Sequence, residues 1–373
     1  MPRIHTLFDQ MLAGKASDLH LAVGHPALIR ARGELVALPG PPIEQKEMES
    51  LLFEIVTPEQ RTQITTEWDL DFAYPYEDKA RFRANYFRKV TGLAAVFRVI
   101  PTKILTLADL NCPDAIRKLS ERKSGLIMVT GPTGSGKSTT LAAMINHINL
   151  TRSCHIITIE DPVEFVHPSQ KAQVTHREVG PHASSFTTAI RSAGREDPNV
   201  ILIGELRTTE TMKLALQLAS FGVLVFATVH TNSAASTVER IVNSFPAHEQ
   251  PQVRGLMAES LVGIVAQQLL KTADGKGRVA AHEILIGTSG IASLIRENKT
   301  FQIASAIQTG GSVGMQTLDM ALEKLVVAGK VLPEVALEKA AERDAFLAFV
   351  QRFKDGGGAA AALTPAEPPP AHG

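Results

Sequence analysis

Gly131-Pro-Thr-Gly-Ser-Gly-Lys-Ser138 is the stretch that decides the fold, because it fits the pattern G-x-x-x-x-G-K-[ST]. An apolar stretch, Leu126–Val129, precedes it, and apolar residues at helical spacing, Leu141, Met144 and Ile145, follow it. In a strand, loop and helix of this order, the loop N–H groups face phosphate and the helix N-terminus adds positive potential. An accidental match is expected roughly once in a hundred chains of this length. The stretch therefore predicts a nucleotide-binding loop.

Individual residues of this loop have expected roles. Lys137 is predicted to reach the β- and γ-phosphates of a nucleoside triphosphate, and Ser138 to supply a hydroxyl to Mg²⁺. Glycines allow the backbone to curl around the phosphates. The predicted nucleotide-binding residues are Gly131, Pro132, Thr133, Gly134, Ser135, Gly136, Lys137, Ser138 and Thr139.

Carboxylates end two further apolar stretches that are typical of strands. Asp161 and Glu164 close one of them, and Glu205 follows Val200–Gly204. Because the carboxyl ends of parallel strands lie along one edge of a sheet, these side chains are expected beside the phosphate loop. Glu205 is the candidate for the Mg²⁺ shell, and Glu164 is the candidate that polarises the attacking water. The alternative for each acid is a solvated charge or a helix cap, and Asp161 before Pro162 fits a cap equally well.

A histidine ends a third apolar stretch, Leu224–Val229. His230 is a candidate to touch the γ-phosphate and to report its loss, because an imidazole changes charge near neutral pH. A lone histidine at a strand end is more often a hydrogen-bonded structural residue. The functional interpretation is preferred here only because the neighbouring motifs point to nucleotide chemistry.

The composition is that of a globular protein with balanced charge. The chain has 373 residues, of which 44% are apolar and 20% charged, and 38 basic residues balance 38 acidic ones. No overall field therefore recruits nucleic acid, and a nucleic-acid partner is not expected. Two cysteines cannot form a four-cysteine zinc site. No apolar stretch reaches the ~20 residues of a membrane span, and the N-terminus lacks the apolar core of a signal peptide, so we expect a cytoplasmic protein.

Changes of pattern divide the chain into four expected segments. The first alternates over Ser17–Val23 and Ala27–Leu35 and ends in three strand-like stretches between 69 and 99, which predicts a small α/β domain. The end of the chain is mostly Gly, Ala and Pro, a composition typical of disorder. The segments are an N-terminal domain over 1–101, a linker over 102–112, a core over 113–355 and a disordered tail over 356–373.

The core alternates short apolar stretches with helical ones. The predicted strands are Gly125–Thr130, His155–Glu160, Val200–Gly204 and Leu224–His230, and the chain is expected to be helical after about Gly290. Continuous apolar strands separated by helices indicate a largely parallel sheet that is covered on both faces.

With these motifs in place, the sequence resembles the secretion ATPase superfamily and, within it, the pilus retraction ATPases of the PilT type. The resemblance covers about residues 1–350. It rests on ordered matches along the chain, which are Ala16–Leu21, Arg81–Asn85, Phe97–Pro101, Gly131–Thr140, Ile159–Phe165, Arg191–Pro198, Gly204–Arg207, His230-Thr231 and Ala306–Gly311.

The resemblance implies a PAS-like α/β N-terminal domain followed by a RecA-like P-loop ATPase core, with the nucleotide between the two domains. It also implies that arginines of the N-terminal domain complete the site, and Arg83 and Arg98 are the matching positions. Guanidinium groups there would offset the charge on the transferring phosphoryl oxygens. Without the resemblance, these residues would be interpreted as two surface arginines on an exposed sheet face.

The same resemblance implies a biological role. It predicts an ATP hydrolase that uses Mg²⁺ and forms a homohexamer at the cytoplasmic base of a type IV pilus, peripheral to the inner membrane. Hydrolysis would drive pilin subunits back into the bilayer through an inner-membrane platform protein and so power twitching motility. Paralogous retraction ATPases are candidate partners. The absence of a four-cysteine zinc module and of a long N-terminal extension favours retraction over assembly.

Five positions depart from the family pattern. Val223 stands where a second histidine is usual, Thr208 stands where an acid is usual, and Gly194 is expected to interrupt a helix. Ala292 and Ser293 replace Arg and Asn in the signature that accompanies retraction. The departures keep three alternatives open: an accessory retraction paralogue, a secretion-type motor, or a ring that binds ATP and hardly hydrolyses it. A DNA translocase is disfavoured, because the sequence has no basic stripe with stacking aromatics.

Overall fold

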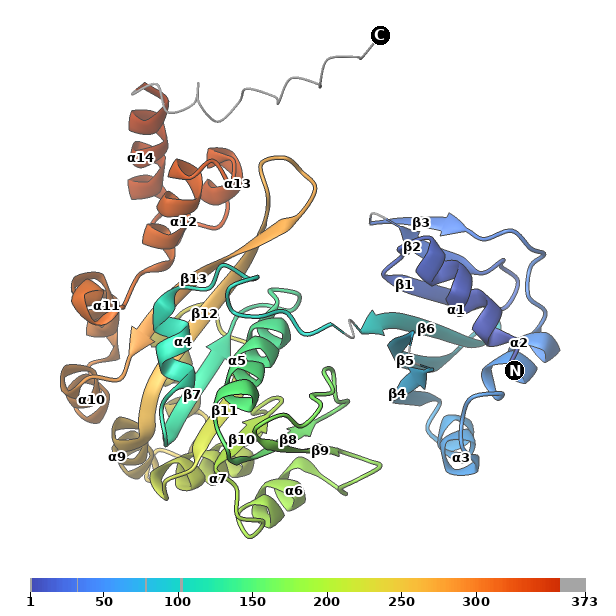
Figure 1. Cartoon of the computed structure of the whole chain (residues 1–373), viewed down its shortest axis with the longest axis horizontal. Coiled ribbons are helices and arrows are strands. Elements are labelled where there is room, and N and C mark those ends of the chain that lie inside the picture. The colour runs from blue at the N-terminus through green and yellow to red at the C-terminus, as the bar shows by residue number, and fades with distance from the viewer. Residues whose placement is uncertain (1, 32, 78, 101–102, 356–373) are drawn as a thin grey trace. The chain divides into compact units, whose positions relative to one another are not determined.

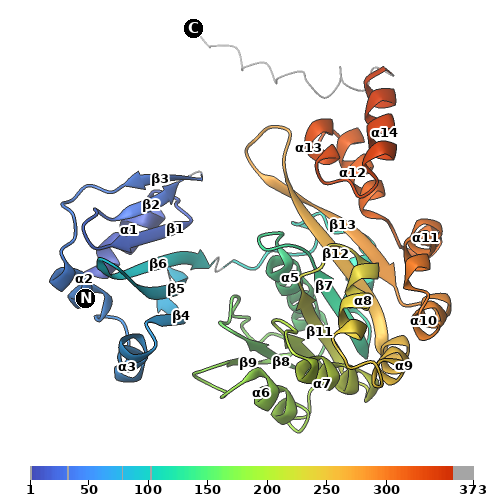
Figure 2. The same cartoon turned by 180° about the vertical axis from the view of Figure 1, so that it is seen from behind.

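The computed structural model describes residues 2–31, 33–77, 79–100 and 103–355 (Figure 1 and, from behind, Figure 2). The chain forms two compact units, of which the first contains Met1–Ile104 and Asp161–His167 and the second contains the rest. Within the described ranges, no helix combines the length and the apolarity that a membrane crossing requires. The predicted tail at 356–373 lies outside the described residues, and the domain boundaries at 101 and 113 remain our proposal.

The first unit is an antiparallel sheet with helices packed on it. Its strand order is β3-β2-β1-β6-β5-β4, and every neighbouring pair runs antiparallel. The last three strands are the three antiparallel strands predicted from the alternation. The elements of this unit are α1 (Ile4–Ala13), β1 (Asp18–Ala22), β2 (Leu28–Ala31), β3 (Glu34–Ala37), α2 (Gln45–Leu52), α3 (Pro58–Thr66), β4 (Asp69–Tyr76), β5 (Ala80–Lys89) and β6 (Gly92–Ile100).

The core of the first unit is aromatic. Phe8 of α1 stacks on Phe82 of β5 with ring centroids 4.2 Å apart, and the ring of Phe97 from β6 meets it edge-on at 5.0 Å. Buried and less buried side chains alternate along these strands, so one face of the sheet packs against the helix. The stretch Ala27–Leu35 contains a hairpin turn, which Gly33 allows because its φ of +95° is unfavourable for other residues.

The second unit contains a seven-stranded sheet in the order β13-β12-β7-β11-β10-β8-β9, which is parallel except between β12 and β13. The predicted α/β class and largely parallel sheet are therefore confirmed. The elements up to the end of the sheet are α4 (Asp114–Ser120), β7 (Gly125–Thr130), α5 (Lys137–Thr151), β8 (His155–Glu160), β9 (Gln173–Glu178), α6 (Phe186–Ala193), β10 (Val200–Ile203), α7 (Thr209–Ser220), β11 (Leu224–Val229), α8 (Ala234–Asn243), α9 (Gln250–Ser260), β12 (Leu261–Lys271) and β13 (Arg278–Ile286).

Helices cover both faces of this sheet because successive side chains of each strand enter different cores. Ile127 and Val129 of β7 pack with α4 and α5, which lie in front of the sheet in Figure 1. Leu126 and Met128 of the same strand join the core formed with α6, α7, α8 and α9, and α8 lies in front in Figure 2. This arrangement buries β7 on both faces and fixes the position of its carboxyl end.

The C-terminal part is helical, as predicted, but the sheet is larger than predicted. β9, β12 and β13 are strands that the pattern did not indicate. Leu270 and Ala281 from the outer part of the β12–β13 hairpin join a core with α12 and α14. The remaining elements are α10 (Ser289–Arg296), the 3-10 turns Thr300–Gln302 and Gly310–Val313, α11 (Ile303–Thr309), α12 (Leu318–Val327), α13 (Pro333–Leu337) and α14 (Arg343–Asp355).

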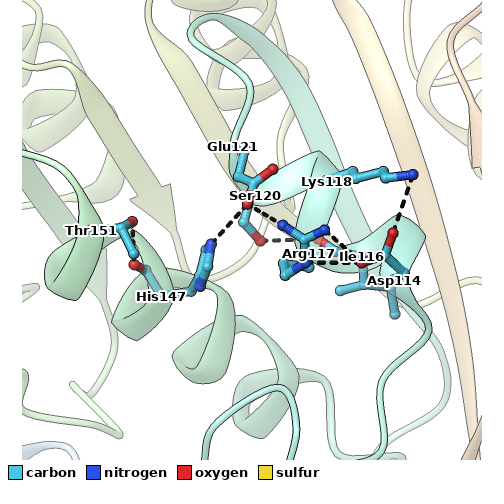
Figure 3. Close-up of polar contacts among 8 residues, drawn as sticks. All are labelled: Asp114, Ile116, Arg117, Lys118, Ser120, Glu121, His147 and Thr151. Carbon is cyan, nitrogen blue, oxygen red and sulfur yellow. Dashed lines mark hydrogen bonds and ion pairs between the residues drawn. The ribbon is translucent and has the colours of Figure 1, made fainter.

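Polar contacts fasten α4 to α5, the helix that follows the phosphate loop (Figure 3). Arg117 pairs with Asp114 at 2.7 Å and also with Glu121. Glu121 in turn lies 3.4 Å from Nε2 of His147 on α5. These charges are largely exposed, so the pairs add little to stability. The position of α5 rests mainly on the buried apolar contacts that both helices make with the sheet.

Candidate active site

The phosphate loop connects β7 to α5, in the place that the sequence predicts. β7 is buried along its whole length and ends at Thr130, and α5 begins at Lys137. Gly136 adopts left-handed backbone (φ +87°) at the N-terminus of α5 and offers no side chain to cap the first N–H groups. These N–H groups stand at the positive end of a 15-residue helix and can bind an anion.

The register of the sheet places two predicted side chains at the same edge as the loop. Val229 of β11 pairs with the last residue of β7, so His230 follows beside the start of the loop. The N–H of Leu206 donates to the carbonyl of Thr228 at 3.0 Å, so the segment that carries Glu205 lies against the end of β11. The parallel sheet therefore brings together residues that are far apart in the sequence.

Lys137, His230 and Glu205 form a continuous polar chain at this edge. The Nζ of Lys137 donates to the carbonyls of Gly131 and Pro132 at 2.9 and 3.1 Å and lies 3.5 Å from Nδ1 of His230. The Nε2 of His230 lies 3.3 Å from Oε1 of Glu205. Because an ammonium group can only donate, Nδ1 accepts, and the proton of a neutral imidazole is on Nε2, facing the carboxylate.

Arg207 holds the other oxygen of the Glu205 carboxylate. Its Nε donates to Oε2 of Glu205 at 2.8 Å. The side chain of Glu205 is 23% exposed, whereas that of Arg207 is 75% exposed. The carboxylate is therefore oriented from two sides and still accessible at the sheet edge.

The residues predicted to hold Mg²⁺ suit that ion in chemical type. Ser138 lies half-buried in the first turn of α5, and Glu205 offers carboxylate oxygens at the neighbouring strand end. Hydroxyl and carboxylate oxygens, completed by phosphate oxygens and water, are the ligands that Mg²⁺ prefers. Among the residues that the structure describes, no group of three or more His, Cys, Asp or Glu side chains is placed to hold a metal ion.

A cavity of about 690 Å³ adjoins the first turn of α5 on the side of β12. Its wall includes Gly136, Thr140, Gln267, Arg278 and His282. Burial lowers the pKa of His282 to about 4, so this imidazole is neutral near pH 7. The volume lies within the usual range of ligand pockets and is large enough for a nucleoside.

Arg83 and Arg98 lie opposite each other on β5 and β6 of the first unit. Like charges in this position destabilise a sheet unless other groups offset them. Nε of Arg98 donates to Oδ1 of Asp18 at 2.7 Å, and Nε of Arg83 lies 3.9 Å from Asp71. Burial alone would raise the pKa of Asp18, but hydrogen bonds from Ser17 and Arg98 hold it below its ordinary value. Asp18 is therefore a charged anchor for Arg98.

Glu164 and Asp161 lie in the loop after β8, Glu164 half-buried and Asp161 exposed. This loop belongs to the first compact unit, whereas the phosphate loop belongs to the second. The structure thus brings Lys137, Glu205 and His230 together within one unit. The participation of Glu164 and of the two arginines in the same site stays a prediction.

Two buried polar residues that contact predicted site residues were not found from the sequence. Gln267 of β12 is hydrogen-bonded to the phosphate loop at Ser135, and Asp18 of β1 holds Arg98. The only sequence signal for Gln267 is a polar residue within an apolar stretch, which also occurs on exposed strand faces. Asp18 lies in the motif Ala16–Leu21, but nothing in that motif indicates its partner.

Three departures from the family pattern have structural explanations. Val223 precedes β11 and therefore lies at the opposite end of that strand from His230. Thr208 caps α7 by accepting from the N–H of Thr211 at 3.2 Å, a role that an acid in this position could also fill. Gly194 ends α6 as its C-cap, so the expected interruption stands at the end of this helix and not at an interior position.

Comparisons with known proteins agree with this geometry. Residues 4–332 match the family model described as type II/IV secretion system protein. The type IV pilus retraction ATPase PilT of Pseudomonas aeruginosa is 50% identical over 325 residues, which cover 87% of this chain and 94% of that protein. A twitching motility protein of Neisseria gonorrhoeae is 49% identical over 313 residues, which cover 84% of each chain.

A solved structure supports the same assignment. The crystal structure of the pilus retraction motor PilT with bound ADP superposes with a TM-score of 0.85 and 41% identity, covering 92% of this chain and 98% of that one. The resemblance inferred from the sequence motifs is therefore confirmed. The chain belongs to the family of type II/IV secretion system proteins.

Proposed function

We propose that this chain is the ATP-driven motor that retracts a type IV pilus. The chain is an ATP hydrolase of the secretion ATPase family, since it matches the family model over most of its length and is 50% identical to an ATPase. The observation that carries the proposal is the convergence of Lys137, His230 and Glu205 beside the uncapped N-terminus of α5. The relatives named for retraction and twitching supply the biological role.

ATP binds with its phosphates on the loop and its nucleoside in the adjoining cavity. The N–H groups of residues 131–138 and the first turn of α5 receive the β- and γ-phosphates. The ammonium of Lys137, which contacts the carbonyls of Gly131 and Pro132, turns to the phosphate oxygens. The cavity of about 690 Å³ shields the base from water.

Ser138 and Glu205 would hold Mg²⁺, and when bound this ion would offset the negative charge of the phosphates. Ser138 reaches this position because it belongs to the first turn of α5. Arg207 keeps Glu205 in orientation, so its carboxylate stays ordered when His230 turns from it to the nucleotide.

Side chains at the strand ends and on the first unit assist hydrolysis. Glu164 orients and polarises the attacking water, and His230 contacts the γ-phosphate with its Nε2–H. Arg83 and Arg98 offset the charge that spreads over the transferring phosphoryl oxygens. When the γ-phosphate leaves, His230 changes partners at the start of the segment that leads into α8. Loss of phosphate is thereby communicated to a helix of the core.

The motor is a homohexamer in which nucleotide binding clamps the N-terminal domain of one subunit against the core of its neighbour. Product release reopens the clamp, and the movement passes to an inner-membrane platform protein that returns pilin to the bilayer. The ring works in the cytoplasm at the pilus base, peripheral to the inner membrane. Paralogous retraction ATPases are candidate partners, and nucleic acid is not.

The proposal is tested by steady-state phosphate release from the purified full-length chain, with and without Mg²⁺. Lys137→Ala and Glu205→Ala are expected to lower kcat at least about a hundredfold, because the first removes a positive charge aimed at the phosphates and the second removes a ligand of Mg²⁺. Lys118→Ala is the matched control, since this lysine of α4 is 70% exposed. Turnover near the wild-type rate in either site variant would contradict the assignment of the site.

Deletion of the gene separates the main retraction motor from an accessory paralogue. Loss of the main motor leaves cells with excess pili and no twitching. Normal retraction in the deletion strain would favour an accessory role, and a secretion defect with normal pili would favour a secretion motor.

A further inference from the structure

Gln267 occupies an unusual place for an amide side chain, in the interior of the second unit. It lies on β12, is 2% exposed, and uses both ends of its amide. Its Nε2 donates to the carbonyl of Ser135 in the phosphate loop at 2.6 Å. Its Oε1 accepts from Oγ1 of Thr140 in α5 at 2.7 Å. One buried side chain therefore links the loop to the first turns of the helix that follows it.

The loop packs against Gln267 so closely that only glycine fits at two positions. A Cβ on Gly131 would stand 2.4 Å from the carbonyl oxygen of Gln267, and a Cβ on Gly136 would stand 2.9 Å from its Nε2. Both glycines also have positive φ, +146° and +87°. These two glycines of the motif thus let the loop backbone lie close to Gln267, as well as close to the phosphates.

The bond to Ser135 sets the direction of a neighbouring donor. In a planar trans peptide, the C=O of one residue and the N–H of the next point in opposite directions. Because Gln267 holds the Ser135 carbonyl on the side of β12, the N–H of Gly136 points away from β12. That N–H is one of the loop donors that the motif directs to phosphate.

We propose that Gln267 is a positioning residue for nucleotide binding: it holds the phosphate loop in the conformation that binds phosphate before the nucleotide arrives. Thr140 is its anchor, because the hydroxyl of Thr140 fixes the other end of the amide. The inference rests on the proposed function, since it concerns the same nucleotide site. Gln267 acts through the loop and does not touch the phosphates itself.

The proposal predicts that loss of Gln267 raises the Kd of the nucleotide and leaves kcat nearly unchanged. The loop N–H groups contact phosphates in the ground state and in the transition state alike, so a misplaced loop weakens binding with little effect on kcat. Gln267→Met keeps the shape and removes both hydrogen bonds, which leaves the buried carbonyl of Ser135 and the hydroxyl of Thr140 unpaired. We expect it to raise the Kd of both ATP and ADP about tenfold and to change kcat less than threefold.

The experiment measures Kd by calorimetry and kcat by phosphate release on the full-length chain with Mg²⁺. Thr140→Val should raise both Kd values, and Thr140→Ser, which keeps the hydroxyl, should restore them. Combining Thr140→Val with Gln267→Met should add less than twofold to the effect of Gln267→Met, because both remove the same link. Gln268→Met is the matched control on the other face of β12 and should leave Kd within twofold of the wild type.

Two results would overturn the proposal. One is a Kd within twofold of the wild type in folded Gln267→Met, and the other is a fall in kcat with Kd unchanged. If Gln267→Met does not fold, the comparison of Thr140→Val with Thr140→Ser decides, because equal Kd values in those two variants contradict the role of the anchor. If the wild-type chain itself binds no ATP, the proposed function fails, and this outcome is distinct from a failure that is confined to Gln267.

Discussion

His230 and His282 of the second unit differ in exposure, and only the exposed one can contact a ligand at the sheet edge. The side chain of His230 is 46% exposed, and its two ring nitrogens lie near Lys137 and Glu205. His282 is 3% exposed, and its Nε2 has no hydrogen-bond partner among the described residues. The first can exchange its partners for a ligand at the sheet edge. The second is held neutral by its burial, which lowers its pKa to about 4.

The burial of His282 makes stability depend on pH in a definite direction. In the unfolded chain this imidazole takes up a proton around its ordinary pKa of 6.5, but in the folded chain only around pH 4. The free energy of unfolding therefore contains the full contribution of the neutral imidazole above pH 6.5. This contribution is lost as the pH falls toward 4, and it amounts to about 3 kcal/mol over the whole interval. We expect the thermal unfolding midpoint of His282→Leu to fall less between pH 7 and pH 5 than that of the wild type.

A matched control isolates this effect from the titration of other groups. The side chain of His248 is 81% exposed, so His248→Leu should follow the wild-type curve over the same pH range. Parallel curves for the wild type and His282→Leu would show that His282 does not titrate as its burial implies.

The sequence predicted those site residues whose roles follow from position alone. Lys137 and Ser138 lie at fixed places in the loop motif, and Glu205 and His230 follow strands whose carboxyl ends share one edge. Gln267 could not be predicted in this way, because its role depends on the strand β12 lying directly beside β7. Contacts between distant segments become visible only when the order of the strands is known.

At the scale of elements, β11 shows that two positions close together in the sequence can have unrelated roles, because a strand holds them apart. His230 follows its carboxyl end, and Val223 precedes its amino end. Six residues of strand separate them, which corresponds to about 20 Å. Val223 pairs with the N-terminal end of β7, since its carbonyl accepts from the N–H of Gly125 at 3.0 Å. The missing histidine therefore gives no support, within one subunit, to a ring that fails to hydrolyse ATP.

We expect Val223→His to leave the chemistry unchanged. The new side chain would stand at the edge of the sheet opposite to the phosphate loop, so kcat and the Kd of ADP should both stay within twofold of the wild type. Phosphate release and calorimetry on the full-length chain check this. A tenfold rise in kcat would mean that position 223 acts on the nucleotide. The valine would then again be an argument for a ring that hardly hydrolyses ATP.

The N-terminus of α7 gives a second prediction at this scale. Thr208 forms a capping box with Thr211, in which each side chain accepts from the backbone N–H of the other. Removing the cap with Thr208→Ala should destabilise the second unit by about 1 kcal/mol, whereas Thr208→Asp should retain most of the stability, because aspartate is an effective cap. Urea unfolding followed by circular dichroism measures the difference, and equal midpoints for the three proteins would contradict it.

The strand β12 was missed because no turn separates it from the helix that precedes it. β7, β8, β10 and β11 are short apolar stretches that each follow a helix, and their bounds agree with the prediction to within one residue. α9 instead passes directly into β12 at Ser260 and Leu261, with no Gly or Pro at the junction. Within β12, Gly263 is required because a Cβ would stand 2.7 Å from Leu119 of α4. In the sequence this glycine suggests a break, whereas in the fold it permits helix packing.

At the scale of the whole molecule, the arginine pair connects the first unit to the proposed motor. Arg83 and Arg98 lie side by side on the exposed face of a sheet, a placement that is unfavourable without a further partner of opposite charge. Asp18 contacts Arg98 and Asp71 lies 3.9 Å from Arg83, and both guanidinium groups stay exposed enough to contact the phosphates of a nucleotide as well. In the proposed clamp, the arginines and the phosphate loop belong to different units of the fold and, in a ring, would come from neighbouring subunits.

The last prediction tests this sharing directly. Arg98→Ala in the full-length chain should lower kcat at least about tenfold, because it removes a positive charge from the transferring phosphoryl group, while the Kd of ADP changes less than threefold. Arg88→Ala is the matched control, since Arg88 is an exposed residue of the neighbouring strand β5.

Mixing two inactive variants then shows which subunit supplies the arginine. In equal mixtures of Arg98→Ala and Lys137→Ala subunits, about one quarter of the sites regain both intact residues if each site is shared between neighbours in a ring. Phosphate release from the mixture should therefore rise well above that of either variant alone. If Arg98 acted within its own subunit, no site in the mixture would hold both residues, and the mixture would stay as inactive as its parts.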